Sequence, residues 1–170
     1  MIWVRYERAA DRSAVFNINA RAFGSPNEAR LVDALRESAR PQISLVAQSE
    51  GRVTGHIFFS PVTVGSGART WEAIGLAPMA VEPEWQKQGI GSALVRAGLA
   101  ACRGIHRPVV FVLGHPEYYP RFGFRPAPPL GLRFRGPEFD PAFMVAELEP
   151  GVLGRRTGEV RYLPDFDRFE

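Results

Sequence analysis

The sequence predicts a single α/β domain with a mixed, twisted sheet of about six to seven strands and about four helices. Three observations lead to this prediction. The length of 170 residues is typical of one domain. Hydrophobic residues make up 45% of the chain and charged residues 23%, as in ordinary globular proteins. Strand-like and helix-like runs alternate without an internal repeat or a linker, so residues 1–170 are expected to form one domain.

The first elements are a short strand and two amphipathic helices. Residues 2–6 predict the strand, and Asp11 is a candidate cap for a first helix whose apolar residues recur at three-to-four spacing. The second helix is expected over residues 26–38. Ser25 and Glu28 fit a capping box there, with a proline at the first helical position.

Long β-rich runs predict the central strands. Residues 44–48 and 53–64 are expected to form a hairpin around a turn at 50–51, and residues 71–81 predict the next strand. That strand contains Pro78, which has no amide hydrogen for a sheet hydrogen bond. We therefore expect a bulge at Pro78 that splays this central strand away from a neighbour.

The remaining elements complete the sheet. Apolar residues at helical spacing predict a third helix over 90–104, and the continuously apolar run 109–113 is typical of a buried strand. Strand, helix and strand together predict a right-handed crossover. A proline-rich connection over 126–141 follows a stretch that forms at most a short helix, and residues 143–148 and 159–163 are expected as closing strands.

Composition excludes several classes of function. The net charge is +3, but the basic residues are scattered singly, so nucleic acid binding is not supported. Charges at Arg5, Glu7 and Arg8 interrupt any apolar run near the amino terminus, so neither a secretory signal nor a membrane anchor is expected, and the cytoplasm is the expected location. Cys102, the only cysteine, is expected to be a buried, inert thiol, and His56 a core residue. Three histidines and one cysteine, widely spaced, predict no metal site.

The segment VEPEWQKQGIGS, residues 81–92, carries the strongest functional signal. Gly89 and Gly91 lie between a strand and a helix, where they allow close approach to a ligand and present free amides to it. Such a site attracts phosphate, and Lys87, the only lysine in the chain, lies within it.

Two familiar nucleotide-binding motifs do not fit this loop. A P-loop needs a lysine before the serine, but Ser92 follows Gly91 directly. A dinucleotide fingerprint needs a glycine or alanine where Leu94 stands. A glycine-rich turn without a ligand is the remaining alternative from the glycines alone.

The order of the motifs resembles that of the GNAT superfamily of N-acetyltransferases. One motif is glutamine or arginine, two residues, glycine, one residue, glycine; another is tyrosine, three residues, glycine, phenylalanine. The segment FVLGHPEYYPRFGFRPA, followed by FMVAEL and GEV, is similar to the bacterial YhbS-like subfamily of predicted acetyltransferases. The resemblance is strong over residues 79–127 and collinear over the rest. The matching residues are Gln86, Gly89, Gly91, Tyr119, Gly123 and Phe124.

The resemblance implies an acetyl-CoA-dependent N-acetyltransferase that moves the acetyl group directly to a primary amine, with no covalent enzyme intermediate. It implies that the edge of Met79, Ala80 and Val81 pairs with the pantetheine arm, and that an amide near Met79 polarises the thioester carbonyl. It assigns pyrophosphate binding to the loop. The loop residues so assigned are Gln86, Lys87, Gln88, Gly89, Ile90, Gly91 and Ser92.

Tyr119 takes the position of the family tyrosine that faces the sulfur of the leaving coenzyme A. A thiol titrates near pH 8.5 and tyrosine near 10, so full proton transfer to the thiolate is uphill by roughly 2 kcal/mol. We therefore expect Tyr119 to stabilise the thiolate by hydrogen bonding unless the site lowers its pKa. The alternative is a tyrosine that only packs beside Phe122 and Phe124.

The acceptor and the base that deprotonates it are left open. Glu28, Glu72, Glu82 and His115 are candidates for the base, and His115 stands after the fifth strand, where other GNAT members often carry an asparagine. The acceptor is an amine of a small molecule or a peptide, and the sequence specifies neither the oligomeric state nor the range of acyl groups. Two rival functions remain: an acyl-CoA-binding or sensing module without turnover, and a structural domain without a ligand.

Overall fold

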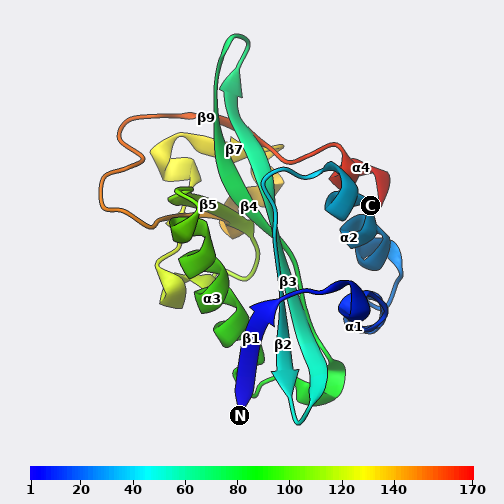
Figure 1. Cartoon of the computed structure of the whole chain (residues 1–170). Helices are drawn as coiled ribbons and strands as arrows, with labels where there is room; N and C mark the ends of the chain where they lie inside the picture. The colour runs from blue at the N-terminus through cyan, green and yellow to red at the C-terminus, as the bar shows by residue number, and fades with distance from the viewer.

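The computed structural model describes residues 1–170, except for the side chain of residue 66, and these residues form one mixed sheet of nine strands with helices on both faces (Figure 1). The strands are β1 (Ile2–Tyr6), β2 (Ile43–Ser49), β3 (Arg52–Ser66), β4 (Arg69–Val81), β5 (Val109–Leu113), β6 (Arg125–Pro126), β7 (Leu132–Phe134), β8 (Phe143–Glu147) and β9 (Gly158–Arg161). The α-helices are α1 (Arg12–Phe23), α2 (Asn27–Ser38), α3 (Ile90–Gly104) and α4 (Asp165–Arg168).

Alternation along β3 explains why both faces of the sheet are covered. Ile57 and Phe59 are fully buried in a cluster with α3, whereas Phe58 between them is fully buried in a cluster with α1 and α2. Successive side chains of a strand point to opposite faces, so a stretch such as residues 57–59, which is apolar at every position, must be covered on both sides. Figure 1 shows α3 on one side of the long β3 and β4 strands and α1 and α2 on the other.

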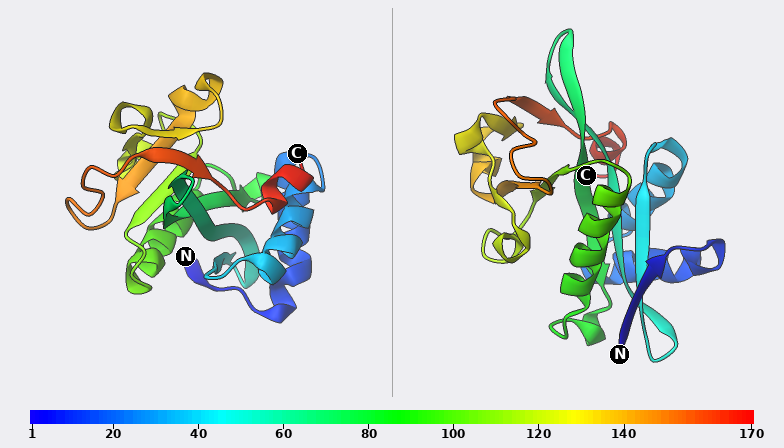
Figure 2. Two further views of the ribbon diagram at one scale, coloured as in Figure 1. Left: turned by 90° about the horizontal axis from the view of Figure 1, so that it is seen from above. Right: turned by 60° about the vertical axis from the view of Figure 1, so that its left-hand side comes forward.

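The strand order is β1-β2-β3-β4-β5-β8-β6, and within this order β4 and β5 are parallel neighbours, joined through α3. The predicted crossover is therefore confirmed. β9 pairs with β3 at Thr63 and Val64, beyond the part of β3 that β2 occupies, and with β7 in parallel. Figure 2 shows the chain running from β9 across the top of the sheet to α4, which lies beside α2.

The bulge expected at Pro78 is present. Ile57 of β3 faces Met79, but Phe59 faces Leu76, so β4 carries one more residue than β3 across Ala77 and Pro78. Pairing of β4 with β5 ends at Leu76. Among the described residues, no strand pairs with the β5-facing edge of β4 beyond that point, so the predicted splay is confirmed.

The proline-rich stretch differs from the expectation of a plain connection. It contains β7 and three-residue and six-residue 3-10 helices, and it begins at β6. β6 and β7 have two and three residues, which is too short for a periodic pattern in the sequence. They raise the strand number above the predicted six to seven, while the fold class itself is confirmed.

The predicted capping box at α2 is wrong. The Ser25 amide donates to the Ala20 carbonyl (3.2 Å) and the Ser25 hydroxyl accepts from the Asn27 amide (3.2 Å), while Pro26 occupies the N-cap. The carboxylate of Glu28 takes no part in capping. It remains available for other contacts at the start of the helix.

Asp11 is the N-cap residue of α1, as predicted, but its side chain does not cap that helix. Its carboxylate caps the preceding 3-10 turn by accepting from the Arg8 amide (2.7 Å). It also accepts two hydrogen bonds from Arg5 (2.7 and 3.0 Å), which hold the carboxyl pKa below its usual range.

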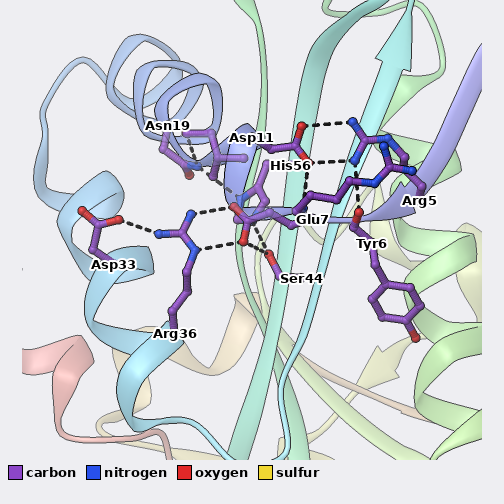
Figure 3. Close-up of polar contacts among 11 residues, drawn as sticks. Arg5, Tyr6, Glu7, Asp11, Asn19, Asp33, Arg36, Ser44 and His56 are labelled. Carbon is purple, nitrogen blue, oxygen red and sulfur yellow. Dashed lines mark hydrogen bonds and ion pairs between the residues drawn. The ribbon is translucent and has the colours of Figure 1, made fainter.

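His56 is a satisfied core residue, as predicted (Figure 3). The Asn19 amide nitrogen, which also donates to the Val15 carbonyl, lies 3.2 Å from Nδ1, so Nδ1 accepts and the ring proton is on Nε2. Nε2 then donates to the Ser44 hydroxyl at 2.9 Å, and that hydroxyl donates to Glu7 at 3.1 Å. Burial of the ring lowers the His56 pKa to about 4, so it is neutral at pH 7.

Cys102 is also buried, as predicted, and burial raises its pKa to about 12. The thiolate is therefore not populated at neutral pH, and the thiol is a packing group of α3.

Candidate active site

A cavity of about 910 Å³ opens where β4 and β5 diverge. On the sheet side it is lined by the β4 bulge, Ala77 to Met79, and by the end of β5 with the two residues after it, Val112 to His115. Tyr119, from the 3-10 helix Tyr119–Phe122, lines the same end. The walls opposite come from α1, α2, the β7 and β9 region and the carboxyl-terminal segment. The cavity therefore lies at the splay that the bulge creates.

Packing fixes the orientation of the Tyr119 ring. A Cβ added at Gly114 would lie 2.4 Å from Tyr119 Cε2, so the ring rests on bare backbone there. Tyr118 and Phe124 contact it edge-on, with centroids 5.1 and 5.6 Å away. Only 7% of Tyr119 is exposed, and burial raises its pKa to about 12. The phenol is thus protonated and is a hydrogen-bond donor at physiological pH.

The glycine-containing loop leaves the start of α3 open. Gly89 has φ +88°, a left-handed conformation that disfavours other residues, and it is the N-cap of α3 without a side-chain cap. The first amides of a helix have no partner within the helix. Residues 86–89 before the helix are exposed and Gly91 and Ser92 are half-buried, and the helix dipole favours an anion at this end.

Two side chains of the loop make internal contacts. Gln86 Nε2 donates to the Val81 carbonyl at 3.1 Å, and Gln88 Nε2 donates to the Glu84 carbonyl at 3.3 Å. The Gln86 contact ties the end of β4 to the loop. The side chains of these two glutamines thus shape the loop, while the backbone of the segment is left to face a ligand.

The structure brings the strand edge, the loop and Tyr119 together through Tyr118. The Tyr118 hydroxyl lies 3.3 Å from the Ser92 hydroxyl. A Cβ added at Gly91 would lie 3.0 Å from the Tyr118 hydroxyl and 3.7 Å from Met79 Cε. Tyr118 and Tyr119 are in edge-on contact. The residues that the resemblance groups by function are therefore contiguous in space.

The four candidate bases differ in whether they line the cavity. Glu82 is buried and accepts two hydrogen bonds from Arg21, at 2.6 and 2.7 Å, which hold its pKa below the usual range. Glu72 is exposed, 3.8 Å from Arg107, and does not line the cavity. Glu28 and His115 both line the cavity with Tyr119. Of the four candidates, only these two line the cavity.

Glu28 has an unusual environment for a surface-helix carboxylate. It lies in the first turn of α2, and its Oε2 is buried with no hydrogen-bond partner among the described residues. Buried polar atoms in folded proteins are nearly always paired with protein, water or a ligand. The carboxylate is therefore available to a polar group that enters the cavity.

Sequence reasoning missed the contribution of the carboxyl-terminal segment to the far wall of the cavity. The far wall consists of aromatic side chains from α1, from residues 134–139 and from the carboxyl-terminal segment, and we call it the aromatic wall. Its members are Phe23, Phe134, Phe139, Tyr162, Phe166 and Phe169. In the sequence RYLPDFDRF, the aromatic residues 162, 166 and 169 have helix-like spacing, and this pattern could have indicated an apolar face in the carboxyl-terminal segment.

Tyr162 occupies the part of this wall next to the sheet. A Cβ on Gly75 of β4 would lie 2.5 Å from Tyr162 Cε2, so a glycine is what allows the ring to pack on the strand. Its hydroxyl is buried without a hydrogen-bond partner among the described residues. Burial, and then the neighbouring Tyr119 phenol, raise its pKa, so it is also a neutral donor.

Among the described residues, no group of three or more His, Cys, Asp or Glu side chains could hold a metal ion. No helix in the described part of the chain is long and apolar enough to cross a membrane.

Sequence comparison finds relatives along the whole chain. Residues 4–127 match the family described as "Acetyltransferase (GNAT) domain". The chain is 38% identical over 167 residues to the uncharacterized N-acetyltransferase YhbS of Escherichia coli K12, which covers 98% of this chain and 99% of the relative. It is 44% identical over 119 residues to the uncharacterized N-acetyltransferase YjhQ of the same strain, covering 69% and 66%.

Structure comparison gives the same result. The crystal structure of E. coli YhbS in complex with CoA matches with a TM-score of 0.89 and 35% identity, covering 99% of this chain and 93% of that one. A GNAT family acetyltransferase from Brucella melitensis, in complex with acetyl-CoA, matches with a TM-score of 0.78 and 34% identity, covering 98% and 99%.

Proposed function

Because this chain belongs to the GNAT family of acetyltransferases, and is thus an acetyl-CoA-dependent acyltransferase, we propose that it transfers the acetyl group directly to a primary amine. Acetyl-CoA is the co-substrate of the family and supplies an activated acetyl thioester. We further propose that residues 1–170 act as one domain, since strands from both ends of the chain share one sheet.

The residues present fit acetyl-CoA. The free edge of Met79, Ala80 and Val81 offers backbone groups for the pantetheine arm, in the manner of an added strand. The open amides at the start of α3, in the segment 86–92, would hold the pyrophosphate. The helix dipole adds about 0.3 to 1 kcal/mol for a nearby negative charge.

Tyr119 is proposed to donate a hydrogen bond to the leaving thiolate. Its raised pKa argues against full proton transfer, because the site makes the phenol a weaker acid than free tyrosine. As the amine nitrogen bonds to the carbonyl carbon, the carbon–sulfur bond breaks and the amine loses one proton. Glu28 and His115 are the candidates to receive that proton, directly or through water.

The observation that carries this proposal is the splay itself, since β4 leaves an unpaired edge that leads from the α3 loop to the buried Tyr119 phenol. A sheet that only needed stability would continue the pairing.

Coenzyme A release from acetyl-CoA with a panel of primary amines tests the proposal. Tyr119→Phe should lower turnover, whereas Tyr6→Phe, a control at an exposed position on β1, should not. A thermal-shift assay separates the rivals, because a ligand at 100 times its Kd adds about 2.7 kcal/mol of stability. Binding without turnover on any amine would indicate a sensing module; no stabilisation would indicate a domain without this ligand.

A further inference from the structure

Most charged groups around the acceptor side of the cavity are already paired with each other. Arg135 forms ion pairs with Asp167 and with Glu170, the latter at 2.6 Å. Arg161 lies 3.6 Å from Glu159. These groups carry two positive and three negative charges, so pairing leaves the rim an excess of only one negative charge.

Glu28 is different because its carboxylate lines the cavity with no partner among the described residues. It stands in the first turn of α2. A carboxylate with a buried, unpaired oxygen binds a cation strongly, since it forms a charge-assisted hydrogen bond without losing an existing partner. The cation that an acetyl acceptor carries is its own ammonium group.

Apart from Glu28 and the paired charges of the rim, the acceptor side is mainly apolar. The aromatic wall faces the cavity together with Leu31 and Pro164. Phe134 and Tyr162 pack edge-on at 5.5 Å, and Tyr162 and Phe166 at 5.1 Å, so the wall is continuous from β7 to α4. The cavity of about 910 Å³ has the size of a small-molecule site, and part of it adjoins the acetyl group at the splay.

We propose that the acceptor is a small hydrophobic primary amine, whose ammonium group is bound by Glu28 and whose apolar body packs against the aromatic wall. This inference rests on the proposed function and specifies its substrate class. A polyamine or an amino acid would have to bring a second charge against the aromatic wall, where the neighbouring charged groups Arg135, Asp167 and Glu170 are already paired with each other. The Tyr162 hydroxyl, unpartnered beside Tyr119, marks the end at which the amine meets the acetyl group.

The first test compares amines that differ at the end away from the reacting nitrogen. Hexylamine, 1,6-diaminohexane and 6-aminohexanoate share one chain, and 2-phenylethylamine presents a ring to the wall. The kcat/KM values of hexylamine and 2-phenylethylamine should exceed those of the other two by at least about tenfold. A lysine-containing peptide is a fifth acceptor and should be as poor as 1,6-diaminohexane.

The second test measures binding without turnover. Calorimetric titration of 2-phenylethylamine and 2-phenylethanol into the protein saturated with coenzyme A compares an ammonium with a neutral group of similar shape. The wild type should bind the ammonium at least about tenfold more tightly, and Glu28→Gln should abolish this preference. Glu37→Gln is the matched control on the same helix, exposed and outside the cavity, and should keep it.

The outcomes distinguish this inference from the proposed function. Fastest coenzyme A release with 1,6-diaminohexane, 6-aminohexanoate or the peptide would overturn the hydrophobic acceptor and leave N-acetyl transfer intact. An ammonium preference that survives Glu28→Gln would overturn the role of Glu28. If no amine releases coenzyme A, the proposed function fails, and the titration still decides whether Glu28 selects an ammonium.

Discussion

Replacing Tyr119 with phenylalanine separates hydrogen bonding from proton transfer at the leaving sulfur. Burial raises the Tyr119 pKa to about 12, whereas a free thiol titrates near 8.5. At about 1.36 kcal/mol for each pKa unit, moving the proton from the phenol to the thiolate is uphill by about 5 kcal/mol. A charge-assisted hydrogen bond contributes about 1.5 to 3 kcal/mol instead. Tyr119→Phe should therefore lower kcat by about 10- to 150-fold.

The assay is steady-state coenzyme A release as a function of pH, together with the Kd of acetyl-CoA for both proteins. The Kd should be unchanged, because the phenol acts on charge that develops during the reaction. The wild-type kcat should show no Tyr119-dependent decline below pH 10, since the phenol stays protonated up to about pH 12. A descending limb with an apparent pKa below 10, absent from Tyr119→Phe, would refute this reasoning and make Tyr119 a true general acid.

Three further predictions follow from the packing. His56 is neutral in the fold with a pKa of about 4 and titrates near 6.5 when unfolded, so the unfolded chain binds an extra proton between these values. The free energy of unfolding should fall by about 3 kcal/mol as pH drops through this window in urea titrations, and His56→Asn should lose that slope. Gly75→Ala places a methyl group 2.5 Å from Tyr162, so amine turnover should fall while acetyl-CoA binding persists, as paired kinetic and calorimetric assays will show. Arg21→Met leaves the buried Glu82 carboxylate unpaired and should cost about 1 to 3 kcal/mol, visible as a lower Tm; an unchanged Tm would contradict it.

The half of the site that we propose for the cofactor is encoded by neighbours in the sequence. Gly89 directly precedes α3, Gly91 lies in its first turn, and Pro78 lies near the end of β4, so one continuous segment forms the bulge, the free edge and the helix start. Tyr119 follows β5 by six residues. Periodicity, turn residues and motif spacing are local properties, and they predicted the strands and helices of this half almost to the residue.

Only the tertiary structure decided the acceptor half. Glu28, Phe134 and Tyr162 are far apart in the chain and meet only because α2, β7 and the segment after β9 converge on the splay. In the sequence Glu28 resembles part of a capping box. In the structure Ser25 makes the hydrogen bonds between α1 and α2, and the Glu28 carboxylate makes no capping contact. Glu82 resembles a candidate base in the sequence, but in the structure its carboxylate accepts a hydrogen bond from Arg21, 61 residues away. The sequence by itself thus determined the fold class and the cofactor loop, because local contacts shape them. Packing between distant segments determined which carboxylate remains available and what kind of surface faces the acceptor.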